Sequence, residues 1–224
     1  MENMKLVLAV LVVLCAMGCS RGFLEHKSTY YDYSEAYDMC FRLKSGVLIV
    51  QVPSEGKKHR LMKAQFENEE KPKKKLKLEE AYNKEINELK QAQRSLVNGF
   101  PAYYTFSKVA FISDSLVHDF KSGKRTEVFL DQELKLTTDE SIDTSQYIMY
   151  VRSLRDFDHL YIYTSENKLP PDPFPYSSTV STGNINIMAK SEKVNPIENH
   201  RIYVAIVTLN RKLNKLYTST KMGF

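Results

Sequence analysis

The chain has 224 residues, of which 42% are hydrophobic, and a formal net charge of +5. With only eight glycines and eight prolines, the composition excludes collagen-like and low-complexity classes and is that of an ordinary globular protein. A chain of this length buries one good core, so a single domain is expected. No internal repeat is present, which argues against solenoids and propellers.

Residues 6–16 form an apolar run preceded by Lys5. The run fits the core of a signal peptide and is too short for a membrane-spanning helix. It ends in Cys15-Ala16-Met17-Gly18-Cys19, which resembles the lipobox of bacterial lipoproteins. The resemblance implies that residues 1–18 are a signal peptide and that Cys19 is acylated, with palmitate for example, and anchors the chain to the membrane. The alternative is an ordinary secretory signal cut near Gly18.

Residues 19–38 are polar and rich in tyrosine, and predict a lipid-anchored tether. The single α/β domain is expected to follow over residues 39–224. If Cys15 leaves with the leader and Cys19 takes lipid, Cys40 cannot form an internal disulfide. Its neighbours are apolar, which favours a buried small side chain over a nucleophile.

The central unit of the domain is expected over residues 46–114. Residues 47–52 are almost wholly apolar without alternation, which is typical of a strand buried on both faces. Residues 76–97 place apolar side chains at steps of three and four, which predicts a helix that Asn98-Gly99 and Pro101 end. Residues 108–114 form a second apolar strand. The pattern predicts a parallel pair with a crossover helix, and a helical hairpin without a sheet is the competing interpretation.

Basic residues are concentrated in residues 57–77, with nine Lys or Arg and three Glu. Such a patch attracts nucleic acid, phosphates or anionic lipid headgroups in other proteins. It lacks interleaved aromatic residues for base stacking, so no nucleic-acid partner is expected. A solvated joint between helices over residues 57–66 and 75–97 explains the pattern more simply, with contact to the membrane surface as the alternative.

The second half of the chain predicts further strands and a last helix. Residues 114–120 read as a short helix, residues 126–130 as a strand, and residues 147–151 and 159–163 as an antiparallel hairpin. A proline-rich loop and a helix over residues 198–218 follow, and the buried stripe of that helix is expected at Ile202, Ile206, Leu209, Leu213 and Leu216. The predicted fold class is α/β, a single-domain mixed sheet with a βαβ crossover and helices on both faces, with a thioredoxin-like fold as the alternative.

Motifs for chemistry are absent from the sequence. It contains no phosphate loop, no Gly-x-Gly-x-x-Gly, no Gly-x-Ser-x-Gly and no His-Glu-x-x-His, so no catalytic residue is assigned and no cofactor is expected. Asp156, Asp158 and His159 are weak metal candidates that would need further ligands, and a polar hairpin turn is favoured there. Phe174 and Tyr176 are the candidate binding residues because prolines hold them rigidly, although packing is the more ordinary role for Phe174.

Three features together resemble small, uncharacterised envelope proteins of Bacteroidota-type bacteria. They are the apolar strand that ends in Val52-Pro53, the strand of residues 108–114 after a charged helix, and Pro173-Phe174-Pro175-Tyr176 before a leucine-rich helix. The resemblance covers residues 47–217. The family has no assigned activity, so it carries over no functional residues. The chain lacks the acidic stretch after Cys19 that resembles a surface-export signal, which implies a periplasm-facing protein.

Two functions follow as hypotheses. The leading one is a lipid-anchored, non-enzymatic module that binds an envelope protein or a glycan. The rival is a hydrolase or metal-dependent enzyme whose site lies at the carboxyl ends of the central strands, near Ser113, Asp114 and Asp131, where open α/β sheets place their ligands.

Overall fold

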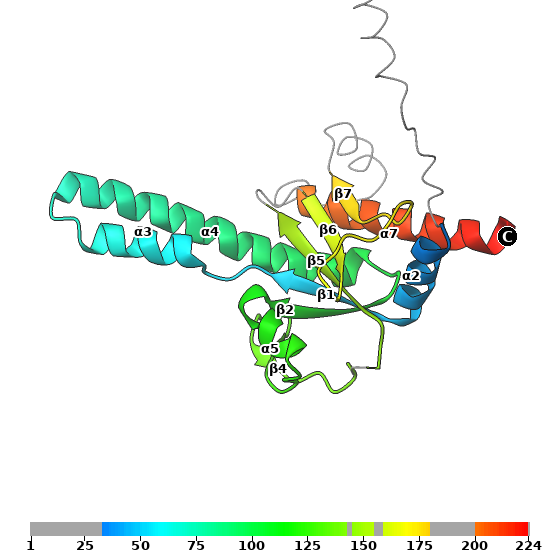
Figure 1. Cartoon of the computed structure of the whole chain (residues 1–224). Helices are drawn as coiled ribbons and strands as arrows, with labels where there is room; N and C mark the ends of the chain where they lie inside the picture. Colours follow the sequence, from blue (N-terminus) through cyan, green and yellow to red (C-terminus); the bar gives the residue numbers. More distant parts are fainter. Residues whose placement is uncertain (1–32, 143–144, 155–158, 180–199, 224) are drawn as a thin grey trace, which may run out of the picture. The chain divides into compact units, whose positions relative to one another are not determined.

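The computed structural model describes residues 33–142, 145–154, 159–179 and 200–223. These residues build one mixed seven-strand sheet with helices on both faces, which confirms the predicted α/β class (Figure 1). The strands lie in the order β4-β3-β2-β1-β5-β6-β7. Their bounds are β1 Val47–Val52, β2 Lys108–Ser113, β3 Phe129–Leu130, β4 Leu136–Thr137, β5 Ile148–Leu154, β6 His159–Thr164 and β7 Ser177–Thr179. The helices are α2 Tyr33–Ser45, α3 Lys57–Glu67, α4 Pro72–Tyr103, the 3₁₀ turn η1 Asp114–Leu116, α5 Val117–Lys121 and α7 His200–Gly223.

The predicted crossover is confirmed. β1 and β2 are parallel, with Val47 opposite Lys108, and α4 connects them. β5 pairs with the other edge of β1, also in parallel, so β1 lies at the centre of the sheet. All six residues of β1 are buried, as expected for a strand covered on both faces.

Two hydrophobic clusters cover the two faces of the sheet. The larger one joins α2, α4 and α7 to one face through residues such as Leu96 and Ile206. The smaller one joins α5 and the segment after it to the other face through Phe120 and Phe129. The five residues predicted as the buried stripe of the last helix are all buried. The cleft described below lies on this second face, where Phe120 and Tyr150 belong both to the smaller cluster and to the cleft lining.

Two expected boundaries are wrong: the start of the folded domain and the end of the crossover helix. Residues 33–38, expected as part of the tether, begin α2, because Ala36, Cys40 and Leu43 recur at helical spacing and are buried. Helix α4 runs past Asn98-Gly99 and includes Pro101. Gly99 is buried against α7, so this glycine permits close packing and does not end the helix. The expected burial of Cys40 is confirmed.

Gly46 joins α2 to β1 at a crowded point. A Cβ atom on Gly46 would lie 2.8 Å from the carbonyl oxygen of Arg42 and closer still to that of Tyr147. The amide of Val47 donates a 2.9 Å hydrogen bond to the carbonyl of Tyr147. The absence of a side chain at Gly46 therefore brings the end of α2 close to the start of β5.

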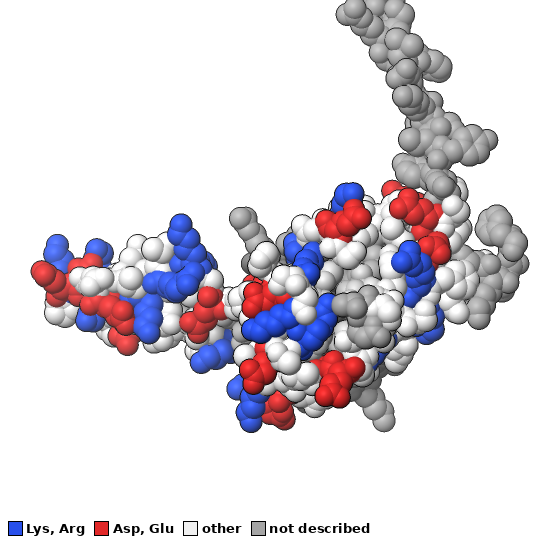
Figure 2. Space-filling model, turned by 60° about the horizontal axis from the view of Figure 1, so that its bottom comes forward, with Lys and Arg blue, Asp and Glu red and all other residues white. Residues whose placement is uncertain are grey.

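Helix α3 and the first half of α4 form a helical hairpin, residues 57–85, that extends away from the strands (Figure 1). No residue of α3 is buried. The ring centroids of Phe66 and Tyr82 lie 5.3 Å apart, and Lys58 pairs with Glu85. Figure 2 shows positive and negative side chains intermixed along this hairpin. The basic stretch of residues 57–77 therefore lies in a solvent-exposed helical hairpin whose surface also carries acidic side chains.

The remaining strands differ from expectation mainly in length. β5 and β6 form the predicted antiparallel pair, with Tyr150 opposite Tyr163. The strand expected over residues 126–130 is reduced to β3, because Glu127 has a positive φ of 52° that interrupts extended backbone. β4 pairs with β3 and was not foreseen.

Candidate functional site

Of the two proline-loop candidates, Phe174 belongs to the core, whereas Tyr176 keeps part of its surface exposed. Phe174 is 1% exposed and belongs to the larger hydrophobic cluster, so it offers no surface to a partner. Tyr176 is half-buried and packs against the same cluster, and its carbonyl accepts a 2.7 Å hydrogen bond from the amide of Ile162. The packing alternative for Phe174 is the one that the structure supports.

Of the three weak metal candidates, His159 alone lies in the part of the chain that the structure describes. Asp156 and Asp158 lie outside the described residues. His159 begins β6, and its ring stacks on that of Tyr161 with centroids 6.5 Å apart. Among the described residues, no group of three His, Cys, Asp or Glu side chains is arranged to hold a metal ion.

The residues of the rival enzyme hypothesis serve the local backbone. Asp114 accepts a 3.0 Å hydrogen bond from the amide of Ser54 and a second bond from the Ser54 hydroxyl, which ties the ends of β1 and β2 together. Asp131 accepts from the amides of Glu133 and Lys135, so its carboxylate closes a turn. Ser113 bonds to the hydroxyl of Ser115. These contacts are structural.

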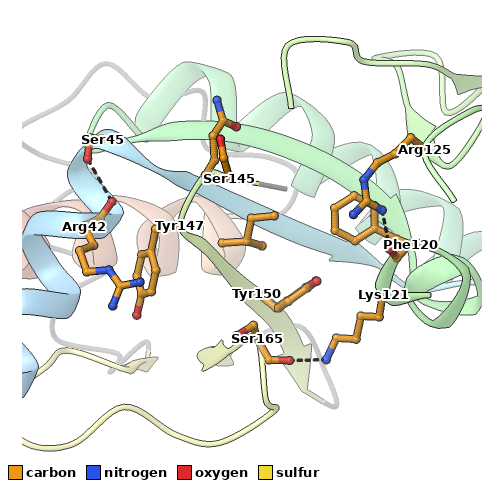
Figure 3. Close-up of a pocket in the computed structure, with 11 residues that line it drawn as sticks. Arg42, Ser45, Phe120, Lys121, Arg125, Ser145, Tyr147, Tyr150 and Ser165 are labelled. Atoms are coloured by element: carbon orange, nitrogen blue, oxygen red, sulfur yellow. Dashed lines mark hydrogen bonds between the residues drawn. The ribbon is translucent and has the colours of Figure 1, made fainter. Parts of the chain in front are cut away.

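A different site lies on the face of the sheet that carries the smaller hydrophobic cluster. A cleft of about 770 Å³ opens beside β5, between the end of α2 and helix α5 (Figure 3). Among the described residues, three cations line it: Arg42, Lys121 and Arg125. We refer to it as the cation cleft. Its other described lining residues are aromatic, apolar or neutral polar: Ser45, Phe120, Ser145, Gln146, Tyr147, Ile148, Tyr150 and Ser165.

Each cation of the cleft lies over an aromatic ring. Such stacking holds a cation in place while its polar edge can still meet a ligand. Figure 3 shows Arg42 beside Tyr147 at one end of the cleft and Lys121 and Arg125 at the other. The three pairs are Arg42 over Tyr147 at 4.1 Å, Lys121 over Tyr150 at 4.8 Å and Arg125 over Phe120 at 4.2 Å, each measured to the ring centroid.

Hydrogen bonds hold two of the three cations, Lys121 and Arg125, further in place. The Nζ of Lys121 donates a 2.8 Å hydrogen bond to the carbonyl of Ser165, which reaches across to the end of β6. Arg125 donates to the carbonyls of Phe120 and Lys124. The side-chain oxygen of Gln146, which also lines the cleft, is buried and has no hydrogen-bond partner among the described residues.

The electrostatics of the cleft reflect partial burial and a surplus of positive charge. Burial lowers the pKa of Lys121, and the positive charge of Arg152 lowers it further. Burial raises the pKa of Tyr150 to about 12, with Arg125 acting in the opposite direction. Tyr150 is therefore a neutral donor near neutral pH, and an anion entering the cleft would relieve the repulsion between Lys121 and Arg152.

Local sequence patterns indicate this site only weakly. Arg42 lies in a segment expected as the start of the domain, and Lys121 and Arg125 read as ordinary charges around a short helix. They meet only because the connection between β2 and β5 folds back over the sheet. The strand expected over residues 147–151 includes Tyr150, but Tyr147 lies just before β5. A spacing of three residues places side chains on opposite faces of a strand, so the sequence does not indicate that both line one cleft.

In comparisons with known proteins, no family model, no curated protein and no solved structure matches the chain. The likeness to envelope proteins and to lipoproteins therefore stays a prediction. Among the helices that the structure describes, none combines the length and apolar character that crossing a bilayer requires.

Proposed function

We propose that this protein is a non-enzymatic binding module of the bacterial cell envelope and that the cation cleft binds a small acidic ligand, one bearing carboxylate or phosphate groups. The observation that carries the proposal is the convergence of Arg42, Lys121 and Arg125 on one cleft with no acidic residue among its described lining. Cations held in this way attract an anion from solution and give it charge-assisted hydrogen bonds.

The charges of the cleft are largely available to a ligand. None of the salt bridges within the described ranges involves Lys121 or Arg125. Arg42 pairs with Asp38 at 3.5 Å, but both side chains are more than half exposed, at 57% and 63%. Such an exposed pair is weak and exchanges readily for a ligand carboxylate or phosphate.

Binding is favoured over catalysis by the chemistry of the lining. The described lining residues supply hydroxyl, amide, guanidinium and ammonium groups, which are hydrogen-bond donors for an anion. A serine nucleophile needs an adjacent general base, most often an imidazole or a carboxylate, and the described lining holds serine hydroxyls but neither of these bases. The hydrolase remains the rival hypothesis, and turnover of a bound ester would support it.

The test is thermal unfolding of the full chain with inorganic phosphate and, separately, with glucuronate, so that the two anionic groups are distinguished. A ligand at a hundred times its dissociation constant adds about 2.7 kcal/mol, which raises the unfolding temperature by several degrees. Lys121→Gln should abolish the shift. Arg211→Gln, which removes the same charge from an exposed position of α7 on the other face of the sheet, should keep it. A shift from neither anion, or a shift unchanged by Lys121→Gln, would reject the cleft as the site.

Location is a separate part of the proposal. Acylation of Cys19 would hold the domain at the membrane, facing the periplasm, where a glycan fragment or an envelope protein could supply the acidic ligand group. Cys19→Ala should move the protein from the membrane fraction to the soluble fraction of the cell envelope. Persistence of the variant in the membrane fraction would exclude the hypothesis that acylated Cys19 anchors the protein. It would not affect the proposal that the cation cleft binds an anion.

A further inference from the structure

Arg152 extends the positive surface beyond the cation cleft. It lies on β5 two residues after Tyr150, so both side chains project from the same face of the sheet. Its guanidinium carbon lies 5.0 Å from the ring centroid of Tyr163. Tyr163 is the cross-strand partner of Tyr150, whose ring lies under Lys121. Lys121, Tyr150, Tyr163 and Arg152 therefore form a continuous row.

A buried glutamine holds Arg152 in this position. Gln51 is a polar residue within the otherwise apolar central strand β1 and is 6% exposed. Its side-chain oxygen accepts a 2.6 Å hydrogen bond from Nε of Arg152. A buried amide is costly unless it is bonded, so this contact indicates a specific placement of the guanidinium. The Nε2 of Gln51 has no partner among the described residues.

Within the described ranges, the terminal nitrogens of Arg152 make no hydrogen bond or ion pair. A guanidinium carries five N–H donors, and Gln51 uses the one on Nε. No salt bridge among the described ranges involves Arg152. The terminal nitrogens of a guanidinium match the two oxygens of a carboxylate or phosphate. This arrangement lies at the carboxyl ends of β1 and β5, where open α/β sheets place their ligands.

We propose that Arg152, oriented by Gln51, is a second anion-binding subsite that adjoins the cation cleft, and that the ligand of this protein carries two acidic groups. One group binds at Lys121 and Arg125, and the other binds at Arg152. The inference rests on the proposed function, because it takes the cleft as the first subsite. It predicts the ligand preference of the two subsites: a ligand with two linked acidic groups binds more tightly than a ligand with a single acidic group.

The test is calorimetric titration of the full chain with inorganic phosphate and with pyrophosphate. Pyrophosphate should bind more tightly, and Arg152→Gln should weaken pyrophosphate binding about tenfold, the usual effect of losing a charged hydrogen bond, while phosphate binding stays nearly unchanged. Lys121→Gln should weaken the binding of both. Gln51→Leu keeps the charge of Arg152 but removes its orienting acceptor, and should reduce the advantage of pyrophosphate as well.

Arg211→Gln provides the control for net charge and should change neither affinity. If Arg152→Gln and Gln51→Leu leave pyrophosphate binding unchanged while Lys121→Gln abolishes phosphate binding, the second subsite is rejected and the proposed function stands. If Arg152→Gln weakens phosphate and pyrophosphate equally, the two groups form one site and the inference is overturned. If neither anion binds the wild-type chain, the proposed function fails together with the inference.

Discussion

Gly99 of α4 packs against the ring of Tyr203 in α7, so closely that a Cβ atom on Gly99 would lie 2.7 Å from the ring carbons Cδ1 and Cε1. The same atom would lie 2.8 Å from Cδ1 of Ile206, which is fully buried. Tyr203 is itself in contact with the ring of Tyr103, with centroids 5.4 Å apart. Neither neighbour can move aside freely, so this contact sets how closely α4 and α7 approach.

Gly99→Ala should destabilise the protein. Overpacking of a core contact costs about 1–3 kcal/mol. Alanine offsets about 1 kcal/mol of this because it favours the helix over glycine. The expected net loss is about 1 kcal/mol in the free energy of unfolding, measured by urea denaturation.

Asn98→Ala is the matched control for this change. Asn98 is exposed in the same turn of α4, so alanine there gains helix propensity without a clash. It should leave the protein as stable as the wild type or more stable by about half a kcal/mol. Equal stability of the two variants would show that α7 yields easily at Gly99.

Gly99 also shows where sequence reasoning reached its limit. A glycine followed by a proline is a strong signal for a helix end, but the signal assumes that the segment has no tertiary contact that favours continuation. Here Phe100 and Val97 are buried in the core on either side of Gly99, and this burial outweighs the cost of Pro101 within the helix. The local pattern could not reveal that α7, a hundred residues later, packs at this point.

The central strands, in contrast, are predictable because their signal lies in residues that are adjacent in the sequence. β1 is buried along its whole length and β2 is buried at residues 110–112, and the residues that fill these positions are apolar neighbours in the sequence, apart from Gln51. The cleft depends on residues from α2, α5 and β5, which are adjacent only in the folded chain. The one local sign was Gln51, a polar residue within an apolar strand, and its meaning depends on Arg152, 101 positions away.

The helical hairpin should open independently of the sheet. Its outer part is held by the contact of Phe66 with Tyr82 and by exposed ion pairs, whereas α4 enters the core only from Ile86 onward. Phe66→Ala should lower the free energy of local opening by about 1 kcal/mol, the size of an aromatic pair. Hydrogen exchange should become about fivefold faster in residues 57–85 and stay unchanged in β1.

Leu61→Ala is the control for the hairpin, because Leu61 lies on the same helix and is 55% exposed. It should leave the exchange rates nearly as in the wild type. Faster exchange in β1 after Phe66→Ala would contradict independent opening and would mean that the hairpin and the sheet unfold as one unit.

Alkaline pH should destabilise the fold through buried acidic groups that must stay protonated. Burial raises the pKa of the Cys40 thiol from 9.0 to about 12, with Lys44 acting weakly in the opposite direction. Burial also raises the pKa of Tyr104 above its usual range. The folded state therefore holds these protons more tightly than the unfolded state, so the stabilisation is complete below pH 9 and is lost as pH rises from about 9 to 12.

The measurement is the free energy of unfolding at pH 8 and at pH 10.5, in a chain whose other cysteines, Cys15 and Cys19, are replaced by serine. Cys40→Ala removes the thiol that packs beside the carbonyl of Leu213 and should lower stability at both pH values. Its further loss between the two pH values should be smaller than that of the chain that keeps Cys40, because the contribution of the buried thiol is then absent. An equal loss in both chains would mean that the thiol ionises without unfolding and that Cys40 is accessible to solvent in the folded state.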